Sequence, residues 1–481
     1  MDEVGIEPAE AAPVKPHRRR WIVLAVVLTV LVVLPVAAYF VTDAHGRAAV
    51  RREIERIEAR GETLDWEKLA PPPVPDDENA ALVYLKAFRL LNDDLGDSRD
   101  VLVQWLDQAP WDEEDLERIA DERHGYTAST RPARPDLTLA SEAEAWEAAR
   151  HVLAQNAQGF DLLRQANAMD RCRFPVNYKG GIAALLPHLA PIRSSARLLI
   201  LESRVKRHDG DIPGAAASVR QVIRLERATH QPCLVPRFVG ILVVGLATRS
   251  GIKPLLNEDG AHPDAWRQLL RDLETLDTRP VMVNAMQGER AMGYQTIENL
   301  SATGGVGPGG LQLPGVLQGP LASLWKPVLR YDTVQHLRYL GDLVAAARLD
   351  PWEALARCDE MESEVKALPR WAVLTRILAP ALSRAFQASA RAEADIALAR
   401  VSLALKLYKH QHGAYPDTLA ALSPAILADV PPDPFTGKPV FYRREGDGFI
   451  LYSVGLNGTD DGGVENKRDP DQGDMVWKFD R

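Results

Sequence analysis

This sequence contains few cysteines, and their placement excludes both a disulfide-stabilised domain and a domain built on a zinc-binding CxxC pair. Among 481 residues only Cys172, Cys233 and Cys358 occur, far apart and odd in number. They form neither a disulfide framework nor a CxxC pair of the zinc-binding kind. One disulfide is allowed, but buried free thiols fit the pattern better. Stability must therefore come mainly from packing.

Basic charge is not in excess either. The 57 lysine and arginine residues face 66 aspartate and glutamate residues, which gives a net charge of −9. A nucleic-acid-binding protein needs a basic face, so we expect no nucleic acid among the partners. Hydrophobic residues make up 46% of the chain and charged residues 26%. This composition is typical of a folded chain rather than a disordered one, and the length of 481 residues suggests two or three domains.

Familiar catalytic patterns are also missing. The sequence has no HExxH, no GxSxG, no CxxC and no dinucleotide-binding fingerprint. His188, beside Pro187, is expected to be packed or capping rather than a base. The glycine-rich segment 301–319 lacks GxxxxGK[ST], so we interpret it as a surface excursion and not as a phosphate loop. We therefore predict no catalytic residue.

One long apolar run is present near the start. Residues 21–41 (WIVLAVVLTVLVVLPVAAYFV) carry no charge and directly follow Arg18, Arg19 and Arg20. As a helix they are long enough to cross the roughly 30 Å hydrocarbon core of a bilayer. We predict a single transmembrane helix over residues 21–42, with the lipid bilayer as a partner. A cleaved signal, whose apolar core is only about 7 to 15 residues, is the alternative.

Basic residues flank both ends of this run, so their number alone does not decide its orientation. The tail arginines adjoin the run, whereas Thr42, Asp43 and His45 precede the first arginine on the other side. We predict that residues 1–20 form a cytoplasmic tail and that the bulk of the chain lies outside the cytoplasm.

The segment 43–75 is expected to connect the membrane to the first packed domain. Val50, Ile54 and Ile57 share one helical face, and Gly61 follows where a helix would end. Four prolines between residues 71 and 75 favour an extended, stiff chain. We predict a short juxtamembrane helix and a proline-rich spacer, with the folded part beginning near Asp76.

Residues 76–383 are predicted to form a helical domain, because apolar residues recur three and four apart between proline and glycine breaks. No period of about 34 residues is sustained, so we expect an irregular α-helical array rather than a repeat protein. Asp211 is expected to cap one helix, with Pro213 in its first turn. The expected helices cover residues 80–91, 112–122, 140–167, 192–207, 212–229, 235–250, 263–276, 333–348 and 352–367.

Residues 384–481 differ in kind and are predicted to form a small α+β module. An apolar-faced helix runs to about Gln411, and Gly413 ends it. A short helix is expected at 417–422, and strands at 439–443 and 448–453 form a hairpin around Gly446. The fold class is therefore mainly α, with a short antiparallel sheet at the C-terminus.

A family resemblance lies in this last part. The strings LYKHQHGAYPDTLAAL, DPFTGKPVFY, GDGFILYSVGLNGTDDGG and GDMVW follow one another within residues 397–477. This region resembles the globular domain of the type II secretion system major pseudopilin. The resemblance implies a pseudopilin-like fold and a bacterial inner (cytoplasmic) membrane as the location. A pseudopilin helix is continuous with its globular domain, whereas about 340 residues intervene here. We expect a terminal module, not a pilin subunit.

Pseudopilins of that class bind a calcium ion in the loop after the last strands. By this resemblance, the candidate ligands are Asn457, Asp460, Asp471 and Asp474, in an acidic loop that spans residues 457–474. Calcium prefers such oxygen ligands, and the ion would fasten the tail strand rather than activate water. Asn457 stands where the family pattern has an aspartate, and the loop is longer here. The alternative is a solvated acidic loop without an ion.

Two hypotheses for function remain. The first is a noncatalytic, membrane-anchored extracytoplasmic scaffold or interaction protein, whose protein partners are unknown and include components of a type II secretion-like system as candidates. The second is an extracytoplasmic hydrolase whose active site is assembled from scattered residues of the helical domain. Buried clusters of glutamate and histidine in that domain would favour the hydrolase.

Overall fold

The structure is a computed structural model that describes residues 18–91, 142–178, 186–258, 260–303, 326–466 and 468–480. This part of the chain is mainly helical, with a small sheet at its C-terminal end. The predicted helix 112–122, residues 1–17 of the predicted tail and residues 304–319 of the glycine-rich segment lie outside the described residues.

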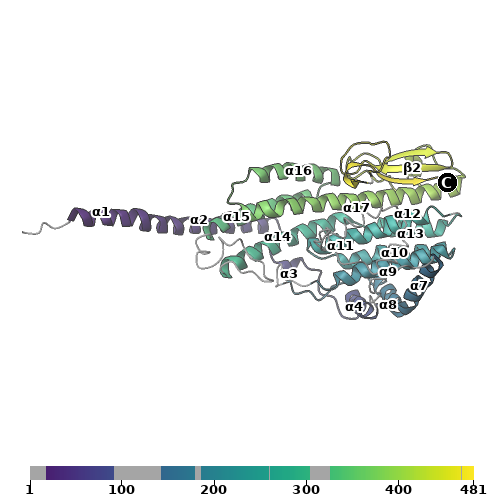
Figure 1. The fold of residues 1–481 in the computed structure, drawn as a ribbon, viewed down its shortest axis with the longest axis horizontal. Helices are drawn as coiled ribbons and strands as arrows, with labels where there is room; N and C mark the ends of the chain where they lie inside the picture. The colour runs from purple at the N-terminus through teal and green to yellow at the C-terminus, as the bar shows by residue number, and fades with distance from the viewer. Residues whose placement is uncertain are drawn as a thin grey trace, which may run out of the picture.

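The apolar run forms one long helix that projects from the body (Figure 1). α1 (Arg18–Leu28) continues through a π-helical turn, η1 (Thr29–Val33), into α2 (Leu34–Ala59). In a regular helix the Pro35 ring would clash with the carbonyl four residues earlier, and the wider turn before it accommodates the ring. The most apolar window of this helix has a mean hydropathy of 2.8 and is 0% buried. The helix is therefore compatible with a single-pass membrane anchor.

A second stretch, Leu234–Leu255, also has the length and hydropathy of a membrane span. Its most apolar window has a mean hydropathy of 1.4, and 56% of that window is buried inside the body. Its apolar residues are therefore used in packing between helices.

The sequence predicts a spacer between the apolar helix and the packed domain, and here the structure differs. The second half of α2 packs along α15 (Lys326–Ala346). Asp43 and Glu53, both buried on α2, accept hydrogen bonds from Arg330 at 2.8 Å and Arg338 at 3.1 Å. These partners are 287 and 285 residues apart in sequence. The packed body therefore begins at Asp43 and not near residue 76.

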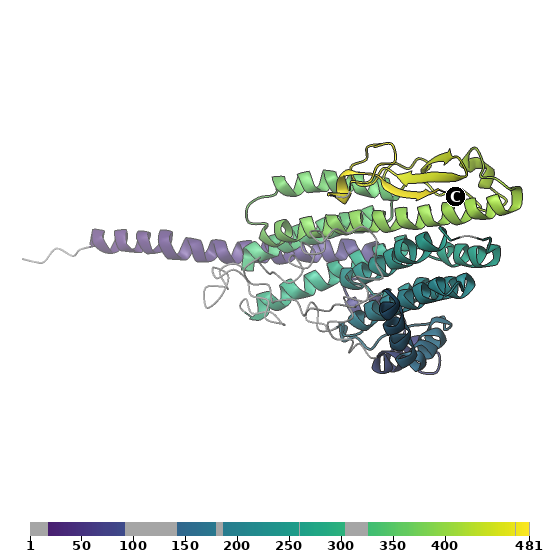
Figure 2. The ribbon, with the colours of Figure 1, turned by 45° about the vertical axis from the view of Figure 1, so that its right-hand side comes forward.

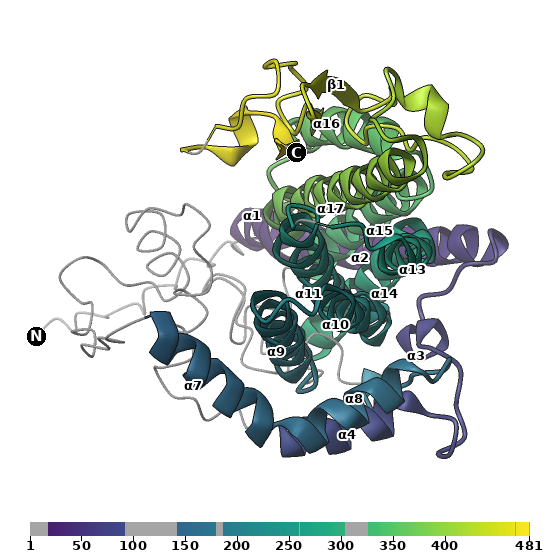
Figure 3. The same cartoon turned by 90° about the vertical axis from the view of Figure 1, so that its right-hand side faces the viewer.

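The predicted helical array is present, with boundaries close to those expected at most helices. Figure 3 places α4, α7 and α8 on the side of the body opposite to the sheet. The elements of this half are α3 (Trp66–Leu69), α4 (Ala80–Leu90), α7 (Glu142–Gln155), α8 (Ala157–Asn167), α9 (Leu189–His208), α10 (Ile212–Leu225), η3 (Glu226–Thr229), α11 (Leu234–Gly245), η4 (Leu246–Ile252), α12 (Lys253–Leu255) and α13 (Pro263–Glu274).

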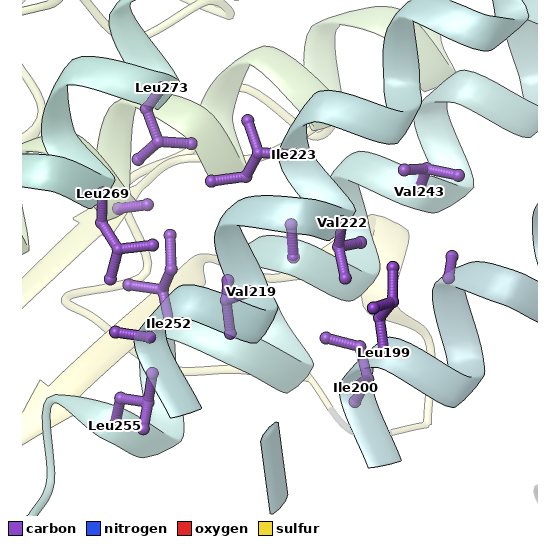
Figure 4. Close-up of a cluster of buried hydrophobic side chains, with 14 of the residues drawn as sticks. Leu199, Ile200, Val219, Val222, Ile223, Val243, Ile252, Leu255, Leu269 and Leu273 are labelled. Carbon is purple, nitrogen blue, oxygen red and sulfur yellow. The ribbon is translucent and has the colours of Figure 1, made fainter. Parts of the chain in front are cut away.

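The α9–α10 hairpin forms as the sequence predicts. The side chain of Asp211 accepts a hydrogen bond from the Gly214 N–H at 2.9 Å and so caps α10, and Pro213 lies in the first turn. The apolar face of α10 then packs on α9, α13 and η4. Figure 4 shows this core, in which Val219, Val222, Ile223, Leu199, Ile252 and Leu269 point toward one another.

A second core lies between four long helices. α14 (Thr278–Thr303), α15 and α16 (Pro351–Ala367) contribute apolar side chains that meet those of α17 (Val373–His412). α14 is not among the predicted helices, although Met282 and Met286 lie four apart and are both buried. The predicted start of α15, residue 333, is seven residues later than its observed start at Lys326.

α17 is longer than predicted, with 40 residues. Pro380 lies within it, although proline inside a helix removes a hydrogen bond and usually marks an end. Gly413 ends the helix with φ +79°, a left-handed conformation that glycine adopts without strain. The predicted boundary between residues 383 and 384 therefore falls inside one continuous helix.

The C-terminal sheet is antiparallel, with the strand order β1 (Phe441–Glu445), β2 (Gly448–Ser453), β3 (Met475–Phe479). The bounds of β2 are those predicted, and a short 3-10 helix, η8 (Leu419–Leu422), precedes the sheet. Figure 2 shows the sheet lying along α17. Phe449 and Trp477 belong to the same buried cluster as Leu403 and Leu407 of α17. The predicted module thus shares its core with the helical array.

Candidate functional site

The acidic loop between β2 and β3 forms an open hollow on the surface. Its volume is about 560 Å³. A short 3-10 turn, η9 (Pro470–Gln472), lies within this loop, and Asp469 caps it by accepting a hydrogen bond from the Asp471 N–H at 3.1 Å. The hollow is lined by Asp461, Val464, Glu465, Asn466, Arg468 and Gln472.

Three of the four predicted calcium ligands lie close together in this loop. Asn457 Nδ2 donates to Asp461 Oδ2 at 3.0 Å. Asp474 accepts hydrogen bonds from the backbone N–H groups of Asp461 at 3.3 Å and Gly463 at 2.7 Å. Asp460 Oδ1 accepts one from the Tyr452 hydroxyl at 3.0 Å. Hydrogen bonds within the protein therefore hold the side chains of Asn457, Asp460 and Asp474 in place.

The fourth predicted ligand, Asp471, is directed elsewhere. Its carboxylate forms an ion pair with Arg391 of α17. On the same side, Lys253 of α12 lies 3.8 Å from Glu465 and donates to the backbone oxygen of Val476 at 2.9 Å. Burial lowers the pKa of Lys253, and the nearby Glu465 acts in the opposite direction. The outer half of the loop is therefore fastened to the helical body.

Within the part of the chain that the structure describes, no three or more His, Cys, Asp or Glu side chains form a group that could hold a metal ion. Burial raises the pKa of Asp474, although three backbone hydrogen bonds act against that shift. Such a carboxylate is stabilised by N–H donors in place of a cation. Calcium binding remains a prediction from the resemblance.

A second set of polar groups is buried in the helical array, around the start of α11. Glu289 of α14 accepts a hydrogen bond from the Leu234 N–H at 2.9 Å, and the Cys233 Sγ lies 3.4 Å from the same carboxylate oxygen. Burial raises the pKa of Glu289 and that of Cys233. A thiol with a raised pKa is a poor nucleophile, so Cys233 is suited to packing rather than to covalent catalysis.

The buried Glu226 of η3 and the partly exposed His230 that follows η3 form a second contact. His230 Nε2 lies 2.7 Å from Glu226 Oε2, and Arg237 Nη1 lies 3.8 Å from the other oxygen. Burial alone would raise the pKa of Glu226, but the hydrogen bond to His230 and the charge of Arg237 lower it overall. Arg237 also donates to Ser389 of α17 at 2.8 Å. This cluster joins η3, α11 and α17.

The space beside this second cluster is small. A cavity of about 30 Å³ is lined in part by Ser389 and Glu393, and that volume holds about one water molecule. Catalysis needs titratable groups that converge on a space for substrate. The Glu289 and Glu226 clusters are therefore best explained as polar contacts that hold neighbouring helices together.

His188 is packed, as the sequence predicts. Its ring stacks on Phe174 with centroids 4.1 Å apart, and its Nε2 lies 2.5 Å from Gln231 Nε2. Burial lowers the pKa of His188 to about 4, although the contact with Gln231 acts in the opposite direction. A neutral, stacked imidazole of this kind contributes to packing.

Two charged residues, the partly buried Glu289 and the buried Arg290, were not predicted from the sequence. Glu289 and Arg290 lie on α14, where no helix was expected. The available signal was the spacing of Met282, Ala285 and Met286, which places apolar side chains on one helical face. The ion-pair partners could not be found in this way, because they come from distant parts of the sequence.

Comparison with known proteins gives no relative for this chain. No family model, no curated protein and no solved structure matches it.

Proposed function

We propose that this protein is a membrane-anchored scaffold, or interaction protein, whose helical body works outside the cytoplasm without catalysing a reaction. One observation carries the proposal: the long apolar helix is continuous with a segment that is built into the body. Asp43 and Glu53 on that segment pair with Arg330 and Arg338 of α15. An anchor joined in this way fixes the orientation of the body relative to the bilayer, as a scaffold requires.

The C-terminal module supplies the proposed contact with a protein partner. Its sheet packs on α17 through a shared core, so one face is used internally. The outer strand β1 carries Arg443, Arg444 and Glu445, and charged edges of this kind disfavour addition of a further strand. We therefore place the partner contact on the loops of the module. Components of a type II secretion-like system are the candidate partners, on the resemblance of residues 397–477.

An extracytoplasmic hydrolase is the second candidate. The contact between the buried Glu226 and the partly exposed His230 is a feature of the kind that would favour it. The small adjacent cavity and the raised pKa of Cys233 weigh against it. Replacing Glu226 with glutamine in a purified sample separates the two candidates, because a hydrolase would lose turnover while a scaffold would keep partner binding.

Two measurements on membranes test the scaffold. After alkaline carbonate washing, the full chain is expected to stay in the membrane pellet, and release into the supernatant would contradict the anchor. Affinity capture from detergent-solubilised membranes is then expected to return envelope proteins. A capture that returned only cytosolic proteins would contradict the proposed location.

A further inference from the structure

Two parallel helices determine how close the body lies to the end of the apolar run. α2 and α15 run in the same direction, because Asp43 pairs with Arg330 and, further along both helices, Glu53 pairs with Arg338. The run ends at Val41, two residues before Asp43. At 1.5 Å per residue, Asp43 and the paired guanidinium lie about 3 Å beyond the end of the run. The first turn of α15 precedes Arg330, so it lies nearer to the end of the apolar run than the paired Asp43 and Arg330 do.

The first turns of α17 lie at this same end of the body. Thr375 Oγ1 donates to Asp332 Oδ1 at 2.7 Å, and the ring of Trp371 meets that of Tyr331 edge-on, with centroids 6.2 Å apart. Tyr331 and Asp332 directly follow Arg330 on α15. Figure 1 shows the apolar helix leaving the body at the end where α15 and α17 begin. A bilayer that surrounds the apolar run would therefore meet these turns.

The side chains exposed at this end have the chemistry of a membrane-water boundary. Ile377 is 64% exposed and Trp371 38% exposed, although both are large and apolar. Arg370 and Arg376 are exposed beside them, and Arg376 also donates to the Leu368 carbonyl at 2.8 Å. Tryptophan is enriched at the polar boundary of bilayers, and anionic head groups attract arginine. A single exposed isoleucine is common on protein surfaces. Ile377 is notable because it lies beside the proposed membrane anchor.

We propose that Arg370, Trp371, Arg376 and Ile377, which we name the membrane seat, rest on the head groups of an anionic bilayer. The body then contacts the membrane at a second place beside its anchor. The head-group layer is about 5 to 7 Å thick on each side, which is enough to reach turns that begin at the level of Asp43. This inference rests on the anchor of the proposed function.

Three single-residue probes on the full chain test the seat. Ile377→Cys reports the seat, Val464→Cys is the matched control, and Leu31→Cys reports the anchor. The three native side chains are similarly exposed, at 64%, 62% and 69%. Val464 lies in the acidic loop, which Asp471 ties to Arg391. Along α17, Arg391 is 14 residues beyond Ile377, a distance of about 21 Å.

Each variant carries a fluorescent thiol label in vesicles of phosphatidylcholine and phosphatidylglycerol. Separate samples contain lipids spin-labelled on the head group or on the acyl chain, which quench nearby fluorophores. The native thiols react slowly, because burial raises the pKa of Cys172 to about 12, that of Cys358 to about 12 and that of Cys233 further.

We expect acyl-chain quenching at position 31, head-group quenching at position 377 and neither at position 464. Quenching at 31 with equal signals at 377 and 464 would overturn the seat and leave the anchor intact. Absence of quenching at 31 would contradict the anchor and the seat together. Replacing phosphatidylglycerol with phosphatidylcholine is expected to weaken quenching at 377, and an unchanged signal would overturn the requirement for anionic lipid.

Discussion

Arg290 Nη1 donates to Glu62 Oε2 at 2.8 Å, across 228 residues of sequence. The side chain of Arg290 is fully buried, and that of Glu62 is only 6% exposed. Arg348 reaches the other oxygen of the same carboxylate at 2.7 Å. The short segment after α2 is thereby joined to α14 and to the turn after α15. The long apolar helix and the body are connected by charge at this point as well as by packing.

Removing the Glu62 charge is expected to destabilise the body strongly. Glu62→Gln leaves the Arg290 guanidinium buried with one partner fewer, and breaking a buried ion pair in this way costs about 3 to 5 kcal/mol. Thermal unfolding of the full chain in detergent measures the change. Glu58→Gln, at an exposed position on α2, is the control. Equal melting temperatures for the two variants would contradict the role of the pair.

The same pair predicts a pH dependence. Burial opposes the charged form of Glu62, but the hydrogen bonds from Arg348 and Arg290 outweigh it, so its pKa lies below the ordinary 4.5. The stabilisation is therefore complete above pH 4.5 and is lost as the pH falls through the lowered pKa. We expect the difference in melting temperature between the native chain and Glu62→Gln to shrink below pH 4.5. A constant difference down to pH 3 would show that charge is not its origin.

His336 predicts a second loss of stability as the pH falls, at higher pH values than the loss expected for Glu62. Among the described residues, neither ring nitrogen of this buried histidine has a hydrogen-bond partner, and burial lowers its pKa from 6.5 to about 4. The unfolded chain takes up the proton first, so folding stability falls between pH 6.5 and 4, by about 2 kcal/mol at pH 5. His336→Leu is expected to remove this slope in chemical denaturation at pH 8 and pH 5. Retention of the slope in that variant, with exposed His410→Leu as control, would contradict the assignment.

Gly288 predicts a steric effect at the α14–α11 junction. A Cβ atom there would lie 1.8 Å from the carbonyl oxygen of Pro232, which also accepts a hydrogen bond from Trp66 Nε1 at 2.6 Å. Gly288→Ala is therefore expected to cost about 1 to 3 kcal/mol or more. At Gly341 the nearest atoms would be 3.9 Å away, so Gly341→Ala should instead stabilise its helix by about 1 kcal/mol. Unfolding curves that ranked these variants in reverse would contradict the packing described.

Calcium gives a test of the resemblance to pseudopilins. If an ion binds Asp460 and Asp474, millimolar calcium is expected to raise the melting temperature of the full chain relative to a chelator. Asp474→Asn is expected to abolish that rise. Identical melting with calcium and with chelator would remove the metal from the account and favour the solvated loop.

The parts of the fold that depend on near neighbours were predictable. The cap at Asp211, the bounds of β2 and the end of α17 at Gly413 follow from local chemistry. The continuity of α17 across Pro380 was not predictable in this way, because tertiary packing holds the helix together at a residue that usually ends helices.

The candidate site residues show the same difference between contacts with near neighbours and contacts with residues distant in sequence. Asn457, Asp460 and Asp474 are close in sequence and lie close in space, whereas Asp471 pairs with Arg391, 80 residues away. The ion pairs of Glu62 and Asp43 join segments more than 200 residues apart. Because no local pattern encodes such pairs, the packing of α2 against α15 could be found only from the structure.

Protease accessibility in intact spheroplasts tests the central claim most directly. With an epitope added after the last residue, the account predicts that external protease removes the epitope while a cytoplasmic marker stays whole. An epitope that survived in intact spheroplasts, and was lost only after they were lysed, would place the body inside the cell and contradict the account.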